Sequence, residues 1–284
     1  MTNRTAAIVY DFDGTLAEGN IQEHSFIPRL GIEKCEFWKG VKEQAEEHDA
    51  DEILVYMWRM LEVARAKNVA VTRTAMIEHG RATPLFAGVE SWFNRINAYA
   101  RSQQLDLEHY IISSGIEEMI QGCTIYGQFK RVFASRFIYD ENDEAVWPGV
   151  AVNYTTKTQF LFRINKGIDT TYDNEAINRW VPMDERPVPF ERMIFVGDGE
   201  TDIPAMKMVR HQGGHSVAVF DPKKWERLEL QKRVHSLIAE DRVHFVAPAD
   251  YSENSQLDVT IKGSLGRFGN RLRHPGSARL GKVA

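Results

Sequence analysis

The chain has 284 residues, of which 43% are hydrophobic and 26% are charged, and its formal net charge is -5. This composition supports a sizeable core, either in one large domain or in a domain that carries a smaller insert. The acidic balance argues against a dedicated nucleic-acid binder, whose surface carries a basic surplus. No apolar run approaches the roughly 20 residues that cross a bilayer.

The two cysteines point to the compartment rather than to a structural role. Cys35 and Cys123 lack the spacing of a metal site or of a disulfide framework. The N-terminus also lacks the cationic region and long apolar core of a secretory signal. We therefore expect a reduced, cytoplasmic setting without a membrane partner, whereas the oligomeric state does not follow from the sequence.

Short apolar runs, each followed by glycine, proline or a polar residue, predict the strands of a sheet. Helical stretches separate these runs, as is typical of buried parallel strands in an α/β fold. We predict a Rossmann-like parallel sheet, whose ligands would bind beyond the carboxyl ends of the strands. The runs cover residues 6–10, 110–112, 193–196, 216–220 and 243–247.

Helical periodicity replaces the strand pattern after the first run. Between residues 49 and 68, apolar residues recur at helical spacing, and either Asp49 or Asp51 is placed to cap the helix. A further helix follows from Val89 to about residue 100 and leads into the second strand. We therefore predict a core of residues 1–16 and 84–262, interrupted by a helical insert of residues 17–83.

The second half of the chain contains three less regular segments. Residues 131–156 alternate β-like runs around an acidic turn, which predicts a hairpin. Residues 169–189 are polar and rich in proline, and we predict mainly loop. Residues 263–284 contain glycine, serine and arginine but no acidic residue, which is typical of a flexible basic tail.

The first strand ends in a pair of carboxylates, in the segment DFDGTL. In extended backbone Asp11 and Asp13 point to the same side. Two unit charges about 4 Å apart repel by about 4 kcal/mol at an effective dielectric near 20. A divalent cation such as Mg²⁺ would offset this repulsion, although Asp and Gly are also common in simple turns.

Three further segments place polar groups near the same edge of the sheet. Ser113, Ser114 and Gly115 follow the second strand, where a hydroxyl and backbone N–H groups can bind a phosphate oxygen. Asp198 and Asp202, in the segment GDGETD, follow the third strand. Each segment alone is most simply a turn. A fourth element, Lys157, would alone be a solvated lysine.

Taken in order, these four elements resemble the motifs of the haloacid dehalogenase superfamily. The insert after the first motif is similar to the cap of its phosphoserine phosphatase-like group. The resemblance implies that Asp11 is the nucleophile that forms an aspartyl-phosphate, and that Asp13 is the general acid and base. It also implies that Mg²⁺ is held by the side chains of Asp11 and Asp198 and by the backbone carbonyl of Asp13, with Asp202 supporting the site.

The same resemblance implies how a substrate is held. Ser113, Ser114, Gly115 and Lys157 are expected to bind the phosphoryl oxygens. Arg59, on a helix of the insert, matches the arginine that binds a substrate carboxylate, although a solvated arginine explains it equally simply. Asn20 stands where a glutamate would bind the amine of phosphoserine, so phosphoserine is not the expected substrate.

The sequence thus predicts a magnesium-dependent phosphatase that acts on a small phosphorylated metabolite. The second aspartate distinguishes it from dehalogenases, which need no acid for a halide leaving group. Two alternatives remain. A phosphotransferase would carry the same residues, and a non-catalytic binding or regulatory protein would keep the fold.

Overall fold

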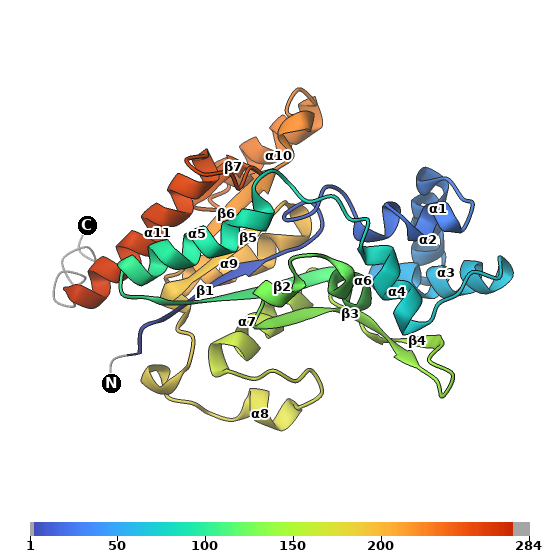
Figure 1. Cartoon of the computed structure of the whole chain (residues 1–284), viewed down its shortest axis with the longest axis horizontal. Coiled ribbons are helices and arrows are strands. Elements are labelled where there is room, and N and C mark those ends of the chain that lie inside the picture. The colour runs from blue at the N-terminus through green and yellow to red at the C-terminus, as the bar shows by residue number, and fades with distance from the viewer. Residues whose placement is uncertain (1–2, 275–284) are drawn as a thin grey trace.

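The structure is a computed structural model that describes residues 3–274, except for the side chain of Glu200. Its centre is a seven-stranded sheet in the order β4-β3-β2-β1-β5-β6-β7 (Figure 1). All neighbouring strands are parallel except β3 and β4. The strands are β1 (Thr5–Tyr10), β2 (Asp106–Ile116), β3 (Arg131–Tyr139), β4 (Ala145–Val150), β5 (Met193–Gly197), β6 (His215–Phe220) and β7 (Phe245–Pro248).

Helices cover both faces of this sheet because the central strands are buried on both sides. Alternate residues of β1 point to opposite faces: Ile8 packs in the cluster that includes α5 and α11, and Val9 packs in the cluster that includes α7 and α9. Figure 1 shows α5 and α11 side by side. The helices after β1's insert are α5 (Val89–Ser102), α6 (Glu117–Gly122), α7 (Thr156–Lys166), α8 (Asn174–Asn178), α9 (Ile203–His211), α10 (Leu228–Ala239) and α11 (Gln256–Arg273).

The segment between β1 and α5 is helical, as the sequence predicts, and lies to one side of the sheet (Figure 1). Asp51, rather than Asp49, caps α3 by accepting hydrogen bonds from the N–H groups of Ile53 and Leu54. Helix α4 packs against α6 of the core. The elements are η1 (Ile21–Glu23), α1 (Phe26–Arg29), α2 (Lys34–His48), α3 (Glu52–Ala66) and α4 (Arg73–Gly80).

Short 3-10 helices complete the described chain. Within residues 3–274, no helix is long and apolar enough to cross a membrane. The predicted hairpin is β3 and β4, with β3 also joined to the core sheet. The region of residues 169–189 is mainly irregular, as predicted. The 3-10 helices of the core are η2 (Tyr126–Gln128), η3 (Met183–Glu185), η4 (Phe190–Arg192), η5 (Glu200–Asp202) and η6 (Pro222–Lys224).

Two sequence predictions about element ends are wrong. The basic tail does not begin at residue 263, because α11 continues to Arg273 and buries Leu265 and Phe268 in the core; residues 275–284 lie outside the described part. The second strand does not end at Ile112 but runs to Ile116, with a register shift after Ser113. In both segments, burial against the core outweighs the turn-like composition.

Candidate active site

The position of Asp11 is set by the end of strand β1 and by its neighbour β5. Asp11 directly follows β1, and its N–H donates to the carbonyl of Val196 at the end of neighbouring β5. Its Oδ1 accepts a hydrogen bond of 2.7 Å from the N–H of Phe12. The side chain is buried yet lines a cavity at the carboxyl edge of the sheet. Asp11 is therefore fixed by the backbone and faces a space that a ligand can enter.

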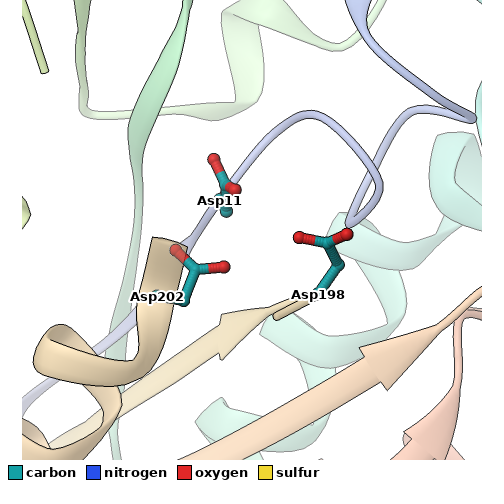
Figure 2. A group of neighbouring side chains, drawn as sticks. All are labelled: Asp11, Asp198 and Asp202. Carbon is teal, nitrogen blue, oxygen red and sulfur yellow. The ribbon is translucent and has the colours of Figure 1, made fainter. Parts of the chain in front are cut away.

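Three carboxylates gather at this point (Figure 2). Asp198 follows β5, and the 3-10 turn η5 brings Asp202 back toward the same place. One oxygen from each of Asp11, Asp198 and Asp202 lies within 4.8 Å of the others. Gly197 allows this approach, because a Cβ atom there would lie 2.2 Å from Oδ2 of Asp202. The turn after β5 thus needs glycine to admit the third acid.

Lys157 is the cation that joins this group. Its Nζ lies 3.0 Å from Oδ2 of Asp11 and 2.7 Å from Oδ1 of Asp202. The side chain is fully buried, and it comes from the first turn of α7. Burial alone lowers the pKa of Lys157, but Asp11 and Asp202 raise it above its ordinary value. The lysine is therefore held as an ammonium between two acids rather than being solvated.

One ammonium does not balance three carboxylates. Burial, reinforced by Asp11, raises the pKa of Asp198 to about 6. The same two causes, in the same order, raise the pKa of Asp202. Oδ2 of Asp202 is buried and has no hydrogen-bond partner in the described structure. An orphan oxygen and surplus negative charge fit a hard divalent cation such as Mg²⁺, for which carboxylate oxygens are the preferred ligands.

Asp13 lies beside this cluster but is not part of it. Its Oδ1 accepts a hydrogen bond of 2.8 Å from the N–H of Ile21, at the start of the insert. Burial, followed by repulsion from Asp11, raises the pKa of Asp13 well above its ordinary value. The two aspartates of the first motif therefore have different environments: Asp11 is paired with a lysine, whereas Asp13 is favoured in its protonated form.

The segment after Ile112 contributes hydroxyl groups. Ser113 and Ser114 line the cavity, and Oγ of Ser114 is buried without a partner in the described structure. Gly115 does not line the cavity, and its N–H donates to Oγ of Ser113 over 3.0 Å. Of the phosphoryl-binding residues predicted in this segment, the structure thus places the two serines, but not Gly115, at the cavity.

The cavity extends well beyond these groups and has a volume of about 900 Å³. Asn20 lies on its wall, where its side-chain amide donates to Glu23. The insert adds Trp38 and Tyr56, and the hydroxyl of Tyr56 donates to the carbonyl of Ser114 over 2.5 Å. Trp38 and Tyr56 are not predicted as site residues, since aromatic residues at helical spacing are indistinguishable from core packing.

The structure does not bring Arg59 to the cavity where the resemblance would place a substrate-binding arginine. Arg59 does not line the cavity; its Nη1 donates to Gln44 over 3.3 Å, and its guanidinium lies 5.8 Å from the ring centre of Phe37. Both partners belong to α2. Helical spacing correctly places Arg59 outside the buried stripe of α3, but it does not reveal that α2 packs against that side.

Arg233 is a site residue that the motifs do not reveal. It comes from α10, lines the cavity, and its positive charge lowers the pKa of the neighbouring Asp198. It lies outside all four motifs, on an amphipathic helix where nothing in the sequence separates it from its cationic neighbour Lys232. Only the fold brings it to the carboxyl edge of the sheet.

A parallel α/β sheet with three acids and a lysine at its carboxyl edge defines the class of protein to which this chain belongs. The sequence matches the haloacid dehalogenase-like hydrolase family over residues 8–207. The chain is therefore a member of that family of hydrolases. The match spans all four motifs, from Asp11 to Asp202, which confirms the resemblance inferred from them.

One relative is similar in sequence, and two solved structures agree with the assignment at the level of the fold. An uncharacterized protein of Borreliella burgdorferi is 27% identical over 88% of this chain and 93% of its own length. A HAD family hydrolase from Salmonella enterica serovar Typhi has a TM-score of 0.57 at 16% identity, covering 90% of this chain and 69% of that chain. A substrate-bound phosphoserine phosphatase has a TM-score of 0.55 at 14% identity, covering 91% of this chain and 98% of that chain.

Proposed function

We propose that this hydrolase is a magnesium-dependent phosphatase that cleaves a small phosphomonoester through an aspartyl-phosphate on Asp11. The observation that carries the proposal is the asymmetric pair of aspartates. One carboxylate is held by a lysine and faces the cavity, and its neighbour favours a proton. A nucleophile beside a general acid is the arrangement that two-step phosphoryl transfer requires.

In the first proposed step, an oxygen of Asp11 attacks phosphorus, and the bond from phosphorus to the leaving-group oxygen breaks. Asp13 donates its proton to that oxygen. In the second step, Asp13 takes a proton from water while the water oxygen attacks phosphorus, which releases inorganic phosphate and restores Asp11. Ser113 would donate a hydrogen bond to a phosphoryl oxygen, and Lys157 would orient Asp11 and offset negative charge.

Asp11, Asp198 and the backbone carbonyl of Asp13 would hold the metal ion, with Asp202 supporting the site, since one oxygen from each of the three acids lies within 4.8 Å of the others. Mg²⁺ bound there would neutralise negative charge on the phosphoryl group as the reaction proceeds. The helices of the insert would act as a cap, since Trp38 and Tyr56 line the same cavity. A capped site favours a small metabolite over a folded phosphoprotein or a nucleic acid.

Both cysteines are free thiols, which supports the proposed cytoplasmic setting.

Phosphate release tests the proposed activity. We expect release from p-nitrophenyl phosphate and from a panel of small phosphomonoesters in the presence of Mg²⁺, and loss of release when EDTA replaces the metal. The measurement is inorganic phosphate formed per enzyme per minute. Release that continues unchanged in EDTA would contradict metal dependence, and no release from any phosphomonoester would contradict the phosphatase.

Metal binding has its own readout in stability. Mg²⁺ at about 100 times its dissociation constant should stabilise the folded protein by about 3 kcal/mol, because it binds only where the three acids are assembled. Thermal unfolding with Mg²⁺ and with EDTA measures this gain. Asp198→Ala should abolish it. Asp106→Ala, at the exposed start of β2, is the matched control and should keep the full shift.

A further inference from the structure

One wall of the cavity carries a basic side chain that the proposed reaction does not use. Lys224, Arg227 and Arg233 lie on this wall, which is formed by η6, α10 and the residues between them. Lys224 is paired with Asp221 at 3.2 Å, and Arg227 is exposed to solvent. Arg233 is half-buried. Of the three, Arg233 is therefore the best placed to bind a ligand inside the cavity.

The guanidinium of Arg233 lies against the loop that carries the acids. A Cβ atom on Gly199 would lie 3.1 Å from Nη1, 3.2 Å from Cζ and 3.5 Å from Nε of Arg233. Three nearly equal distances mean that the flat guanidinium faces the glycine. Gly199 thus lets the guanidinium lie close to the loop, and a Cβ atom at that position would require it to shift by a few tenths of an ångström.

Arg233 has no ion pair with any side chain that the structure describes, Glu200 being outside that set. Its charge acts on Asp198 only through space. A guanidinium offers five N–H donors in a fork that matches carboxylate and phosphate oxygens. Lys157, by contrast, is already bonded to two acids. Within the described residues, Arg233 is therefore a cation without an ion-pair partner beside Asp198.

The cavity has room for a ligand group at this position. Its volume of about 900 Å³ exceeds the space of a phosphoryl group beside Asp11. The insert contributes aromatic surface, since Trp38 and Tyr56 pack edge to face with ring centres 5.7 Å apart. The leaving group of a bound phosphomonoester would thus meet both aromatic side chains of the insert and Arg233 of α10, a helix that also lines the cavity with Glu229 and Leu230.

We propose that Arg233 binds a second anionic group, a carboxylate or a phosphate, on the leaving group of the substrate. The inference rests on the proposed function, because it assumes that the first phosphoryl group lies at Asp11. It assigns the selection of a phosphomonoester that carries a second anionic group to Arg233 on α10 of the core. It does not assign that selection to Arg59 of the insert, whose guanidinium donates to Gln44 of α2.

Binding without turnover tests this proposal separately from catalysis. In the Asp11→Asn background with Mg²⁺, calorimetry would compare three six-carbon ligands: glucitol 6-phosphate, 6-phosphogluconate and glucitol 1,6-bisphosphate. We expect at least one of the two ligands with a second anionic group, 6-phosphogluconate or glucitol 1,6-bisphosphate, to bind about 10 to 100 times more tightly than glucitol 6-phosphate. The ligand with the larger advantage identifies the second group as carboxylate or phosphate.

Variants of α10 then assign the advantage to one side chain. Arg233→Gln should remove it, and Arg233→Lys should keep only part of it, because lysine retains the charge but not the fork. Lys232→Gln is the matched control: it removes one positive charge from the same helix at an exposed residue that does not line the cavity, and it should keep the advantage.

Equal affinities for all three ligands, or an advantage that survives Arg233→Gln, would overturn the inference. Phosphate release by the unmodified protein is measured in parallel and reports on the proposed function. If release is absent but the Arg233-dependent preference is present, the anion site stands and the phosphatase fails. If release is present and the preference is absent, the phosphatase stands and the anion site fails.

Discussion

Asp11→Asn should lower phosphate release at least about 10⁴-fold while the protein stays folded. Asparagine keeps the size of the side chain and can still accept the hydrogen bond from the N–H of Phe12, but it lacks the carboxylate that attacks phosphorus. The rate of phosphate release measures the loss, and circular dichroism verifies the fold. A variant that keeps more than a few per cent of the activity would exclude Asp11 as the nucleophile.

Asp13→Asn is the matched control, since it changes the neighbouring aspartate in the same way. Its effect should depend on the leaving group, because nitrophenolate departs without a proton whereas an alkoxide needs one. In the first step, measured as leaving-group release in a single turnover, we expect a much larger loss with an alkyl phosphate than with p-nitrophenyl phosphate; the later hydrolysis step is common to both substrates. Asp11→Asn should affect both substrates alike. Equal losses for Asp13→Asn on both substrates would argue against its role as general acid.

Much of this site follows from the sequence because its parts are local. A buried parallel strand fixes where its carboxyl end lies, and the residue after the strand is therefore placed by the sheet. Asp11 and Asp198 follow β1 and β5, which are neighbours, so their proximity is a consequence of strand order. Lys157 is harder to derive, since its place beside Asp11 depends on how α7 packs, and only the family resemblance indicated it.

The features that the sequence does not reveal depend on packing between distant elements. Arg59 and Arg233 are both arginines on amphipathic helices, and nothing local separates them. Arg59 donates to Gln44 of α2, whereas Arg233 lines the cavity and lies against Gly199. The end of α11 shows the same limit: glycine, serine and arginine suggest a tail, yet the apolar residues at helical spacing, Leu265 among them, are buried.

Lys157→Met should destabilise the metal-free protein by about 3–5 kcal/mol, the typical cost of leaving buried charges without their partner. The methionine fills a similar volume, but Asp11 and Asp202 lose the ammonium that lies 3.0 and 2.7 Å away. Activity should also fall, by about 10²-fold or more. Urea unfolding in EDTA measures the stability. Lys207→Met, at an exposed residue of α9, should change stability by less than about 0.5 kcal/mol.

The loss caused by Lys157→Met should also grow as the pH rises from 5 to 8. The pKa of Asp198 is already raised to about 6 from its ordinary 3.8, so near pH 5 the folded protein holds a proton that the unfolded chain has released. Between those two pKa values the stability of such a group falls as pH rises. Without Lys157 the acids must either take up protons or repel one another. The acids can take up protons at low pH, whereas at high pH they stay charged and repel one another. Mg²⁺ should therefore restore much of the stability at pH 8. Equal losses at both pH values would show that Lys157 contributes packing rather than charge compensation.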